Sequence, residues 1–437
     1  MLNPIFALLV VAAVLTAALG DTMPAVSAAA IDSAKSAVQL AIGLIGQMAM
    51  WLGFMAILEA AGVMRGVARL LRPILSRLFP DVPPDHPAMA AMTLNLGANV
   101  LGLANAATPF GIKAMIELER LNARPGVASN AMVMFLAINT SGVAVLAFDI
   151  IAVRAELGAQ IVSGVLLPSA LATACSTVVG VVAVKLIERL PAFAAERYPP
   201  SEAKTSPSLT WGAGSASDRP TDVPETGVSR GGTVVAIATA GVILVAFPRF
   251  VLGALAEGAT GLDVVKAAAN EWLLPILMLS IVLAGLSRGV KVYEVFIEGA
   301  KGGFHVAVAI IPYLVAILVA VGMLRASGAL DLFITGIRPL TDALGFPAGA
   351  LPMALVRPLS GSGALGVAAE IMRVEGPDSL LGFTVSVMNG STATTFYVLA
   401  VYYGAVGIRA VRHTVWACLA ADAAGAVASV FFARLFF

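Results

Sequence analysis

Long apolar runs alternate with short polar or Gly- and Pro-containing stretches along the whole chain. Each run approaches or exceeds the roughly 18 apolar residues that mark a membrane-spanning helix. Because backbone groups in lipid must pair within their own segment, these runs predict helices and an all-α polytopic membrane protein. The predicted helices cover residues 3–19, 38–60, 127–153, 161–187, 233–255, 272–287, 303–323, 379–404 and 411–435. We interpret the first run as a retained helix rather than a signal peptide, because no basic region precedes it.

Two further segments, 88–116 and 347–372, interrupt the apolar pattern with glycine, proline and polar residues. Each follows an Arg/Leu-rich segment, at 62–79 and at 324–343, which we expect to be an interfacial helix. Glycine and proline at membrane depth free backbone groups that must be satisfied by protein or face a wet cavity. We therefore predict a broken or re-entrant helical hairpin in each of the two segments.

A polar stretch divides the chain. Residues 191–230 are rich in Pro, Ser, Gly, Thr and charged residues, the composition of a solvated linker. The predicted organisation is a first membrane half at 1–190, a polar cytoplasmic linker at 191–230 and a second membrane half at 231–437.

The two halves carry the same landmarks in the same order, as internal repeats of transporters do. The landmarks are an apolar segment, an Arg-Pro segment, a broken hairpin and a helix with a polar centre. The matching stretches are WLGFMAILEAAGVMR (51–65) with PYLVAILVAVGMLR (312–325), LLRPIL (70–75) with GIRPLT (336–341), and Asn139-Thr140-Ser141 with Asn389-Gly390-Ser391-Thr392.

Composition and charge agree with this reading. The chain has 437 residues, 59% hydrophobic and only 12% charged, with a mean hydropathy of +0.93, whereas soluble domains have roughly 25% charged residues. With the N-terminus in the cytoplasm, two thirds of the 27 Lys and Arg residues fall on the cytoplasmic side, and the second half is inverted relative to the first. The net charge of +1 gives no indication of nucleic-acid binding.

The broken segments and the polar helix centres supply the candidate site. Half-helix ends present partial charges to ions and polar substrates, and amide, hydroxyl and guanidinium groups add donors and acceptors. In the first hairpin we expect Thr108-Pro109 to end one half-helix. The predicted substrate-binding side chains are Asn95, Asn99, Asn105, Thr108, Asn139, Thr140, Ser141, Arg357, Ser360, Ser362, Asn389, Ser391 and Thr392.

Other interpretations of these residues are open. Small and polar residues in membrane helices often serve only close packing and interhelical hydrogen bonds, and Arg357 could instead extend to the membrane interface. Asp149 lies near a predicted helix end with Arg154 beyond it, which favours an interfacial role. Asp422 lies deeper, among small residues, and is a candidate for proton or cation coupling.

Several chemistries find no support. The chain has no P-loop, nucleophile-elbow or metalloprotease motif, so we expect no enzyme. Its two cysteines, Cys175 and Cys418, lie in separate predicted helices and indicate neither a disulfide framework nor a metal site. We expect no cofactor.

At the level of whole motifs, NLGANVLGLANAATPFGIKAM (95–115) resembles the signature of spore maturation protein A. VRPLSGSGALGV (356–367) and MNGSTATTFYVLAVYYGAVGIR (388–409) resemble spore maturation protein B. The resemblance covers nearly the whole chain except 191–230, as if the two proteins were fused. Both belong to the Gate-domain group, related to concentrative nucleoside transporters and to the membrane part of the ferrous-iron transporter FeoB. The resemblance implies two Gate domains packed as an inverted repeat, without the GTPase domain or membrane Cys cluster of the iron transporter.

The expected function is a secondary transporter or permease of the bacterial inner membrane. It would move a small polar or anionic solute, nucleoside-like or carboxylate, by alternating access, with H⁺ or Na⁺ as a coupling cation. Homodimerisation is suggested by analogy with other Gate-fold proteins. The alternatives are a non-transporting membrane scaffold for envelope or spore maturation and a flippase of lipid-linked substrates.

Overall fold

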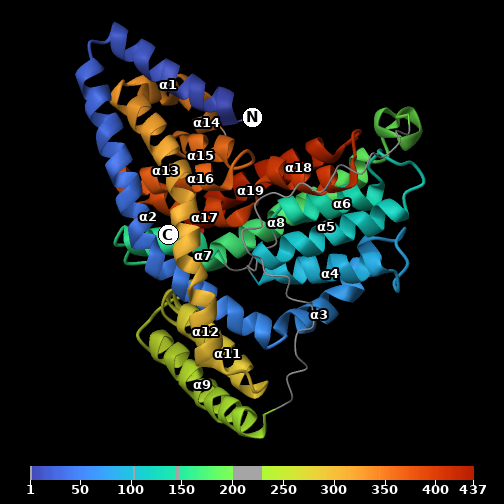
Figure 1. The fold of residues 1–437 in the computed structure, drawn as a ribbon. Coiled ribbons are helices and arrows are strands. Elements are labelled where there is room, and N and C mark those ends of the chain that lie inside the picture. Colours follow the sequence, from blue (N-terminus) through green and yellow to red (C-terminus); the bar gives the residue numbers. More distant parts are fainter. Residues whose placement is uncertain (1, 102–103, 143–146, 200–228, 344) are drawn as a thin grey trace.

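The protein is built from helices (Figure 1). The computed structural model describes residues 2–101, 104–142, 147–199, 229–343 and 345–437. Within these ranges no strand occurs, and an isolated β-bridge joins Val127 to Ala410. The structure is therefore the all-α architecture that the sequence predicts.

The helices of the first part precede the polar linker. They are α1 (Leu2–Leu19), α2 (Met23–Ala60), α3 (Val63–Leu78), α4 (Pro87–Val100), α5 (Ala104–Arg120), α6 (Asn130–Thr140), α7 (Phe148–Glu156) and α8 (Leu166–Ile187). Local sequence explains several starts: Pro87 occupies the first turn of α4, and the Ser129 hydroxyl accepts a hydrogen bond from the Met132 N–H at the start of α6 (3.2 Å).

The second part is longer. Its helices are α9 (Arg230–Ala256), α10 (Gly261–Ala267), α11 (Leu273–Ser287), α12 (Val292–Ala300), α13 (Gly302–Ala326), α14 (Ala329–Ala343), α15 (Leu351–Val356), α16 (Gly361–Glu375), α17 (Leu380–Ser391), α18 (Thr395–Val406) and α19 (Thr414–Phe436). A π-helical turn at Ala268–Trp272 joins α10 to α11. Ser360 and Ser379 cap α16 and α17 through the N–H groups of Gly363 and Gly382.

The chain is a polytopic membrane protein. Five helical segments of its described part are long and apolar enough to cross a bilayer, and a sixth appears if one bent pair, α13 with α14, counts as a broken span. The two members of that pair meet at 78°. The five segments are Met23–Ala60, Leu166–Ile187, Arg230–Ala256, Gly261–Ser287 and Thr414–Phe436.

Two of the predicted continuous spans are wrong. The run at 127–153 contains α6 and α7, and the run at 379–404 contains α17 and α18, so each is a broken helix. Gly142 has a φ of 69°, which a helix cannot accommodate, and Thr392 has extended backbone angles (φ −138°, ψ 163°). Average hydrophobicity does not register such breaks, because their flanking residues stay apolar.

Both predicted hairpins are present. Helices α4 and α5 pack along each other, and α15 packs against α16. The predicted end of the first half-helix at Thr108-Pro109 is wrong, because Pro109 lies inside α5 and the chain turns earlier, after α4 ends at Val100. A proline near a helix start removes only one backbone hydrogen bond, and membrane proteins tolerate it when neighbouring groups compensate.

Helix packing confirms the repeat. The hairpin of each part packs against the first segment of its own broken helix and against the second segment of the other: α5 contacts α6 and α18, and α16 contacts α17 and α7. Likewise α2 pairs with α13, and α8 with α19. The elements α1–α8 thus correspond in order to α12–α19, and α9–α11 are additional.

The two parts run in opposite directions. Gly303 contacts Ala49 and Gly322 contacts Ser33, so α2 and α13 are antiparallel. Helices α8 and α19 are antiparallel too, because Gly180 contacts Ala421 and Ser176 contacts Gly425, four residues further along α19. Figure 1 shows the amphipathic helices α3 and α14 at opposite ends of the α2–α13 pair. Antiparallel packing of equivalent helices is the arrangement of an inverted repeat.

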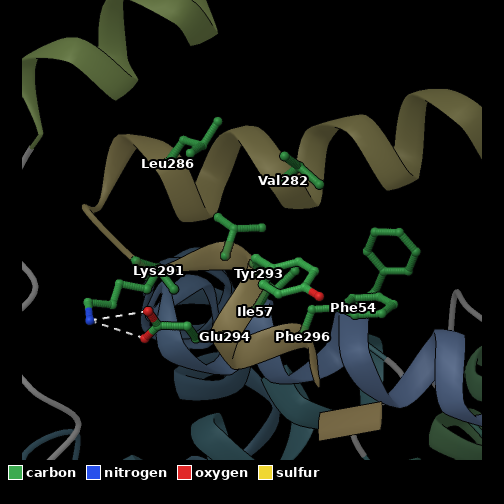
Figure 2. Close-up of a pocket in the computed structure, with 10 residues that line it drawn as sticks. Phe54, Ile57, Val282, Leu286, Lys291, Tyr293, Glu294 and Phe296 are labelled. Carbon is green, nitrogen blue, oxygen red and sulfur yellow. Dashed lines mark hydrogen bonds and ion pairs between the residues drawn. The ribbon is translucent and has the colours of Figure 1, made fainter. Parts of the chain in front are cut away.

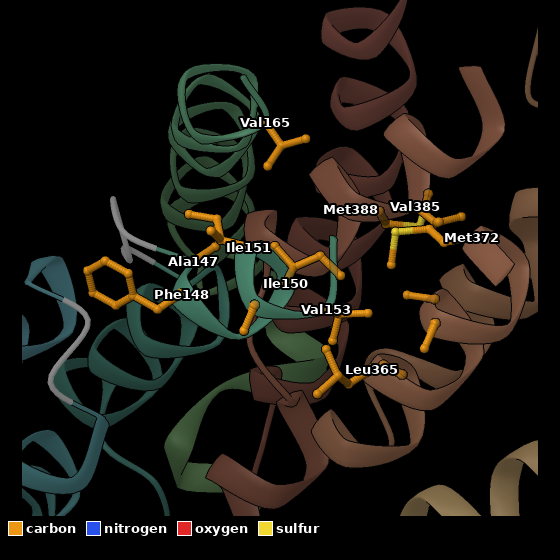
Figure 3. Packing of buried hydrophobic residues seen from close by; sticks show 14 of the residues in the cluster. Ala147, Phe148, Ile150, Ile151, Val153, Val165, Leu365, Met372, Val385 and Met388 are labelled. Atoms are coloured by element: carbon orange, nitrogen blue, oxygen red, sulfur yellow. The ribbon is translucent and has the colours of Figure 1, made fainter. Parts of the chain in front are cut away.

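Apolar side chains fill the interface between the two parts around α7, α16 and α17. Figure 3 shows Ile150 and Val153 of α7 beside Leu365 and Met372 of α16, with Met388 of α17 close by. Between helices in a membrane, packing of this kind stabilises through van der Waals contacts. The cluster holds the second hairpin against the second segment of the first broken helix.

Candidate functional site

The two helix breaks touch at the centre of the molecule. The Ala393 N–H donates to the Thr140 carbonyl oxygen (3.0 Å). Gly142 lies so close to the other break that a Cβ there would be 2.8 Å from the Thr392 backbone. The backbone groups freed by one break are thus partly satisfied by the other, as non-helical backbone at membrane depth requires.

The first hairpin joins this centre through its asparagines. The Asn99 side-chain amide donates to Asn139 Oδ1 (2.9 Å), and the Asn139 amide donates to the Phe135 carbonyl oxygen (2.8 Å). One turn earlier, the fully buried Asn95 donates to the Ala107 carbonyl oxygen (2.7 Å) and to the Tyr402 hydroxyl (3.0 Å).

Asn95 and Tyr402 also mark where the first hairpin meets the second part of the chain. Gly111 faces the Tyr402 hydroxyl so closely that any side chain would collide with the ring. Thr108 is half-buried on α5, and the side chain of Asn105 lies outside the described residues. The predicted contribution of Asn105 therefore stays a prediction.

The second hairpin reaches the opposite break. The Arg357 guanidinium donates to the Thr392 carbonyl oxygen, and the Phe396 N–H donates to the Pro358 carbonyl oxygen (3.0 Å). Arg357 thus lies at the centre and not at an interface. Ser360 uses its hydroxyl to cap α16, and Ser362 is half-buried in the first turn of that helix.

Arg357 interacts electrostatically with two carboxylates, those of Asp149 on α7 and Asp422 on α19. Asp149 accepts a hydrogen bond from the Asn389 amide (3.1 Å), and Asp422 accepts one from the Thr395 hydroxyl (2.7 Å). The expected interfacial role of Asp149 is therefore wrong. The break between α6 and α7 brings the first turn of α7 to the centre, whereas a continuous helix would place it near an end.

Other hydroxyls of the predicted set have structural partners. Thr140 and Ser141 donate to carbonyl oxygens of their own helix, and Ser141 also pairs with Thr177 (2.9 Å). Ser391 donates to the Met388 carbonyl oxygen (3.0 Å) and accepts from Ser429 (2.9 Å). These groups stabilise the breaks by interhelical and local hydrogen bonds.

Four buried polar atoms of the centre have no hydrogen-bond partner in the described structure. They are Asn95 Oδ1, Arg357 Nε, Asn389 Oδ1 and Asp422 Oδ1. More than nine tenths of buried polar groups in native proteins are paired, and an unpaired one costs about 1–3 kcal/mol. Four of the nine such atoms in the described structure thus lie around the two hairpins and the two breaks, where a polar ligand would supply partners.

The sequence reasoning missed two buried arginines at the ends of this interface. Arg154, fully buried, donates to the carbonyl oxygens of Ile161 and Pro377 and pairs with Asp378 (2.7 Å). It thereby joins the loop after α7 to the loop between α16 and α17.

Arg412 makes the equivalent connection with the two repeats exchanged: it joins the loop after α18 to the start of α6 and to the segment after α8. It donates to the Ala128 carbonyl oxygen (3.0 Å), to Asn130 Oδ1 (2.7 Å) and to the Phe193 carbonyl oxygen (2.8 Å). Arg154 lies in the last turn of α7, and Arg412 lies in the loop after α18, so each is at or beyond the end of the second segment of a broken helix. The two arginines do not occupy the same position when the repeats are aligned at Asn139 and Asn389, so no sequence signal identifies them as a pair.

Two oppositely directed repeats, each with a hairpin meeting a broken helix, define a class of membrane proteins with inverted repeats and interrupted helices. A family model described as Gate, nucleoside recognition, matches residues 41–160 and 307–409, together about half of the chain. The chain belongs to this family. The two matched segments end just after α7 and α18, at equivalent points of the repeat.

Two relatives from Bacillus subtilis (strain 168) are similar to the chain. Spore maturation protein B is 47% identical over 165 residues, which cover 38% of this chain and 93% of the relative. Spore maturation protein A is 42% identical over 176 residues, which cover 40% of this chain and 90% of the relative. The resemblance to both proteins is thereby confirmed. No solved structure matches the chain.

Proposed function

We propose that the protein is a secondary permease that moves a small polar or anionic solute through the centre where the hairpins and helix breaks meet. The observation that carries this proposal is the set of unpartnered buried atoms on Asn95, Arg357, Asn389 and Asp422. A purely structural interior would pair these groups, since leaving them unpaired opposes folding. A solute that binds there supplies the missing partners.

The chemistry of the centre suits a solute rich in hydrogen-bonding groups. Asn95 and Asn389 offer amide oxygens as acceptors, and Arg357 offers guanidinium N–H groups that favour carboxylate or phosphate oxygens. The family description, nucleoside recognition, supports a nucleoside-like solute. A carboxylate is the second class of solute to test.

The inverted repeat supports alternating access. Arg154 joins the two parts at one set of loops and Arg412 at the equivalent set. Opening one set while the other stays joined would expose the centre to one side at a time. The buried centre described above corresponds to an occluded state in this scheme.

We place the protein in the bacterial inner membrane with the N-terminus and the 191–230 linker in the cytoplasm. Charge distribution supports this orientation. In spheroplasts of a variant lacking Cys175 and Cys418, a single cysteine at exposed Asp85, before α4, should resist an impermeant maleimide. A single cysteine at exposed Asp331, in the first turn of α14, should react. The reverse labelling pattern contradicts the orientation.

Transport can be measured after reconstitution into liposomes. Uptake of radiolabelled nucleosides, dicarboxylates and amino acids is compared between the wild type and a double variant, Asn99→Ala with Arg357→Ala. The double variant should lose uptake of the accumulated solute, because Asn99 and Arg357 connect the hairpins to the two breaks. Thr239→Ala serves as control, since its exposed hydroxyl bonds only within α9.

Equal uptake by the wild type and the double variant, for every solute accumulated, would mean that the site assignment is wrong. Lack of uptake of any solute, with correctly oriented and folded protein, would instead support the scaffold alternative.

One observation favours the flippase alternative. A groove of about 590 Å³ lies between α2, α11 and α12, away from the central site (Figure 2). Its wall is mostly apolar, with Phe54, Phe296 and Val282, and a Lys291–Glu294 ion pair (3.1 Å) stands beside it. Lipid scrambling by the reconstituted protein, measured with a fluorescent lipid, would support this function in place of solute transport.

A further inference from the structure

The three charged side chains at the centre do not balance. Arg357 carries one positive charge, and Asp149 and Asp422 would carry two negative charges if both were ionised. An uncompensated charge in a buried, apolar environment is costly, and membrane proteins avoid it by pairing or neutralisation. The described centre therefore needs one further positive charge.

The hydrogen bonds distinguish the two carboxylates. Asp149 uses both oxygens as acceptors: Oδ1 accepts from the Ile150 N–H (2.9 Å) and Oδ2 from the Asn389 amide (3.1 Å). Asp422 accepts only at Oδ2, from the Thr395 hydroxyl (2.7 Å), while its buried Oδ1 has no partner. An ionised carboxylate is an acceptor at both oxygens, whereas a protonated one carries a donor on one of them. Asp422 Oδ1 is free to carry that hydrogen.

The surroundings of Asp422 favour a proton over a divalent metal cation. Cations such as Mg²⁺ and Ca²⁺ take about six to eight oxygen ligands, and no cluster of three or more metal-binding side chains occurs among the described residues. A proton needs only one lone pair.

Few other titratable groups face Asp422 in the described structure. Arg357 acts on it from the second hairpin. Cys418 lies one turn before it on α19, and Tyr403 of α18 faces Cys418 in turn. On the neighbouring helices, Thr140 of α6 is hydrogen-bonded to the Cys418 thiol, and Ser176 of α8 donates to the Ala421 carbonyl oxygen (2.8 Å).

We propose that Asp422 binds and releases the coupling proton of the permease, while Asp149 serves as the counter-charge of Arg357. The proposal rests on the proposed function. Asp422 Oδ1 takes a proton from water on one side, forming one O–H bond, and returns it to water on the other side. With the proton bound, Arg357 balances Asp149 and keeps its hydrogen bond to the Thr392 carbonyl oxygen. When the proton leaves, the ionised Asp422 attracts Arg357. The hydrogen bond from Arg357 to the Thr392 carbonyl oxygen, at the break between α17 and α18, then weakens.

Infrared spectroscopy tests the proton site without any solute. The full-length protein in liposomes is compared between acidic and alkaline buffer, and the C=O stretching band of a protonated carboxyl group is followed. Wild type should show a band that disappears at alkaline pH, and Asp422→Asn should lack it. Asp149→Asn leaves Arg357 to balance an ionised Asp422, so in that variant the band should disappear at a lower pH than in the wild type. Both substitutions are nearly isosteric, and a thermal melt verifies that each variant is folded.

Three results would overturn the proposal. They are survival of the band in Asp422→Asn, its absence at every pH in Asp149→Asn, and a band that responds to sodium at constant pH. Each would assign the coupling group or the coupling ion differently.

A transport measurement separates this proposal from the permease itself. With one proton per neutral solute, one unit of pH gradient supports up to about tenfold accumulation. Asp422→Asn should no longer accumulate solute in response to the pH gradient. If the wild type accumulates solute to the same extent with and without a pH gradient, proton coupling is contradicted but the permease function is not. If Asp422 titrates but no solute is transported, the permease function is contradicted but the proton site is not.

Discussion

Gly142 is the residue at which the two helix breaks come closest. Its φ of 69° is unfavourable for any residue with a side chain, by about 1–3 kcal/mol, and a Cβ there would also press on the Thr392 backbone. Gly142→Ala should therefore lower the thermal unfolding temperature clearly. Circular dichroism or a dye-based melt of the detergent-solubilised protein measures this change.

Two other glycines separate the contributions at Gly142. Gly158 has a similar φ of 75° but open space around it, so Gly158→Ala measures only the loss of stability caused by the positive φ. Gly46 lies inside α2 with open space around it, and Gly46→Ala should leave stability unchanged or raise it slightly. If Gly142→Ala is no more destabilising than Gly158→Ala, the breaks do not touch in solution.

A second prediction at the residue scale concerns the buried ion pair between Arg154 and Asp378. Removing one partner of a buried ion pair typically costs about 3–5 kcal/mol, because the other charge is left uncompensated. Arg154→Ala should approach this loss, since the side chain is fully buried and Asp378 is only 30% exposed. Asp378→Ala should also destabilise, and the double variant should lose less than the two single losses together. Strict additivity in thermal melts would mean that the pair does not couple the two parts.

At the scale of elements, the first hairpin is held to the first broken helix by the Asn99–Asn139 hydrogen bond. Hydrogen bonds of this kind in membrane proteins average about 0.6 kcal/mol. Asn99→Ala and Asn139→Ala should each cause a small loss of stability and a large loss of transport. A double-mutant cycle should give a coupling energy of that size. Thr93→Ala, also on α4, is the control, because the Thr93 hydroxyl bonds the Met89 carbonyl oxygen of its own helix.

A coupling energy near zero together with normal transport in Asn99→Ala would mean that the first hairpin is not part of the site.

The breaks in the two helices also bring polar side chains of the two repeats together. An unbroken α6–α7 helix would carry Asp149 away from Asn389, and the two repeats would lose this polar contact at the centre.

At the scale of the whole molecule, the antiparallel pairing of equivalent helices can be tested by disulfide formation. A Cβ on Gly322 would lie 3.3 Å from Ser33 Cβ, and one on Gly180 would lie 3.2 Å from Ala421 Cβ. Disulfides join Cβ atoms about 3.5–4.5 Å apart. The cysteine pairs Ser33→Cys/Gly322→Cys and Gly180→Cys/Ala421→Cys should cross-link with small adjustments, in a background lacking Cys175 and Cys418.

The mismatched pair Ser33→Cys/Gly303→Cys is the control, because Gly303 lies against Ala49 at the other end of the α2–α13 contact. Cross-linking of the mismatched pair in preference to the matched one would indicate parallel packing and would contradict the inverted repeat.

The sequence by itself determined the membrane class, the two hairpins and the order of the repeated elements. These depend on local properties: apolar length decides which segments can span, and Gly, Pro and polar clusters mark where helices stop. The Asn139 and Asn389 elements were identified as site candidates for the same reason, although the breaks beside them were not.

Only the tertiary structure decided which charges meet. Asp149, Arg357 and Asp422 belong to three different helical elements, and nothing local distinguishes a carboxylate that faces the centre from one at an interface. The pairing of Arg154 with Asp378 likewise joins the last turn of α7 to a loop more than two hundred residues away. Such contacts follow from how the inverted repeats pack, because an ionisable side chain in a membrane takes the partner that packing brings within reach.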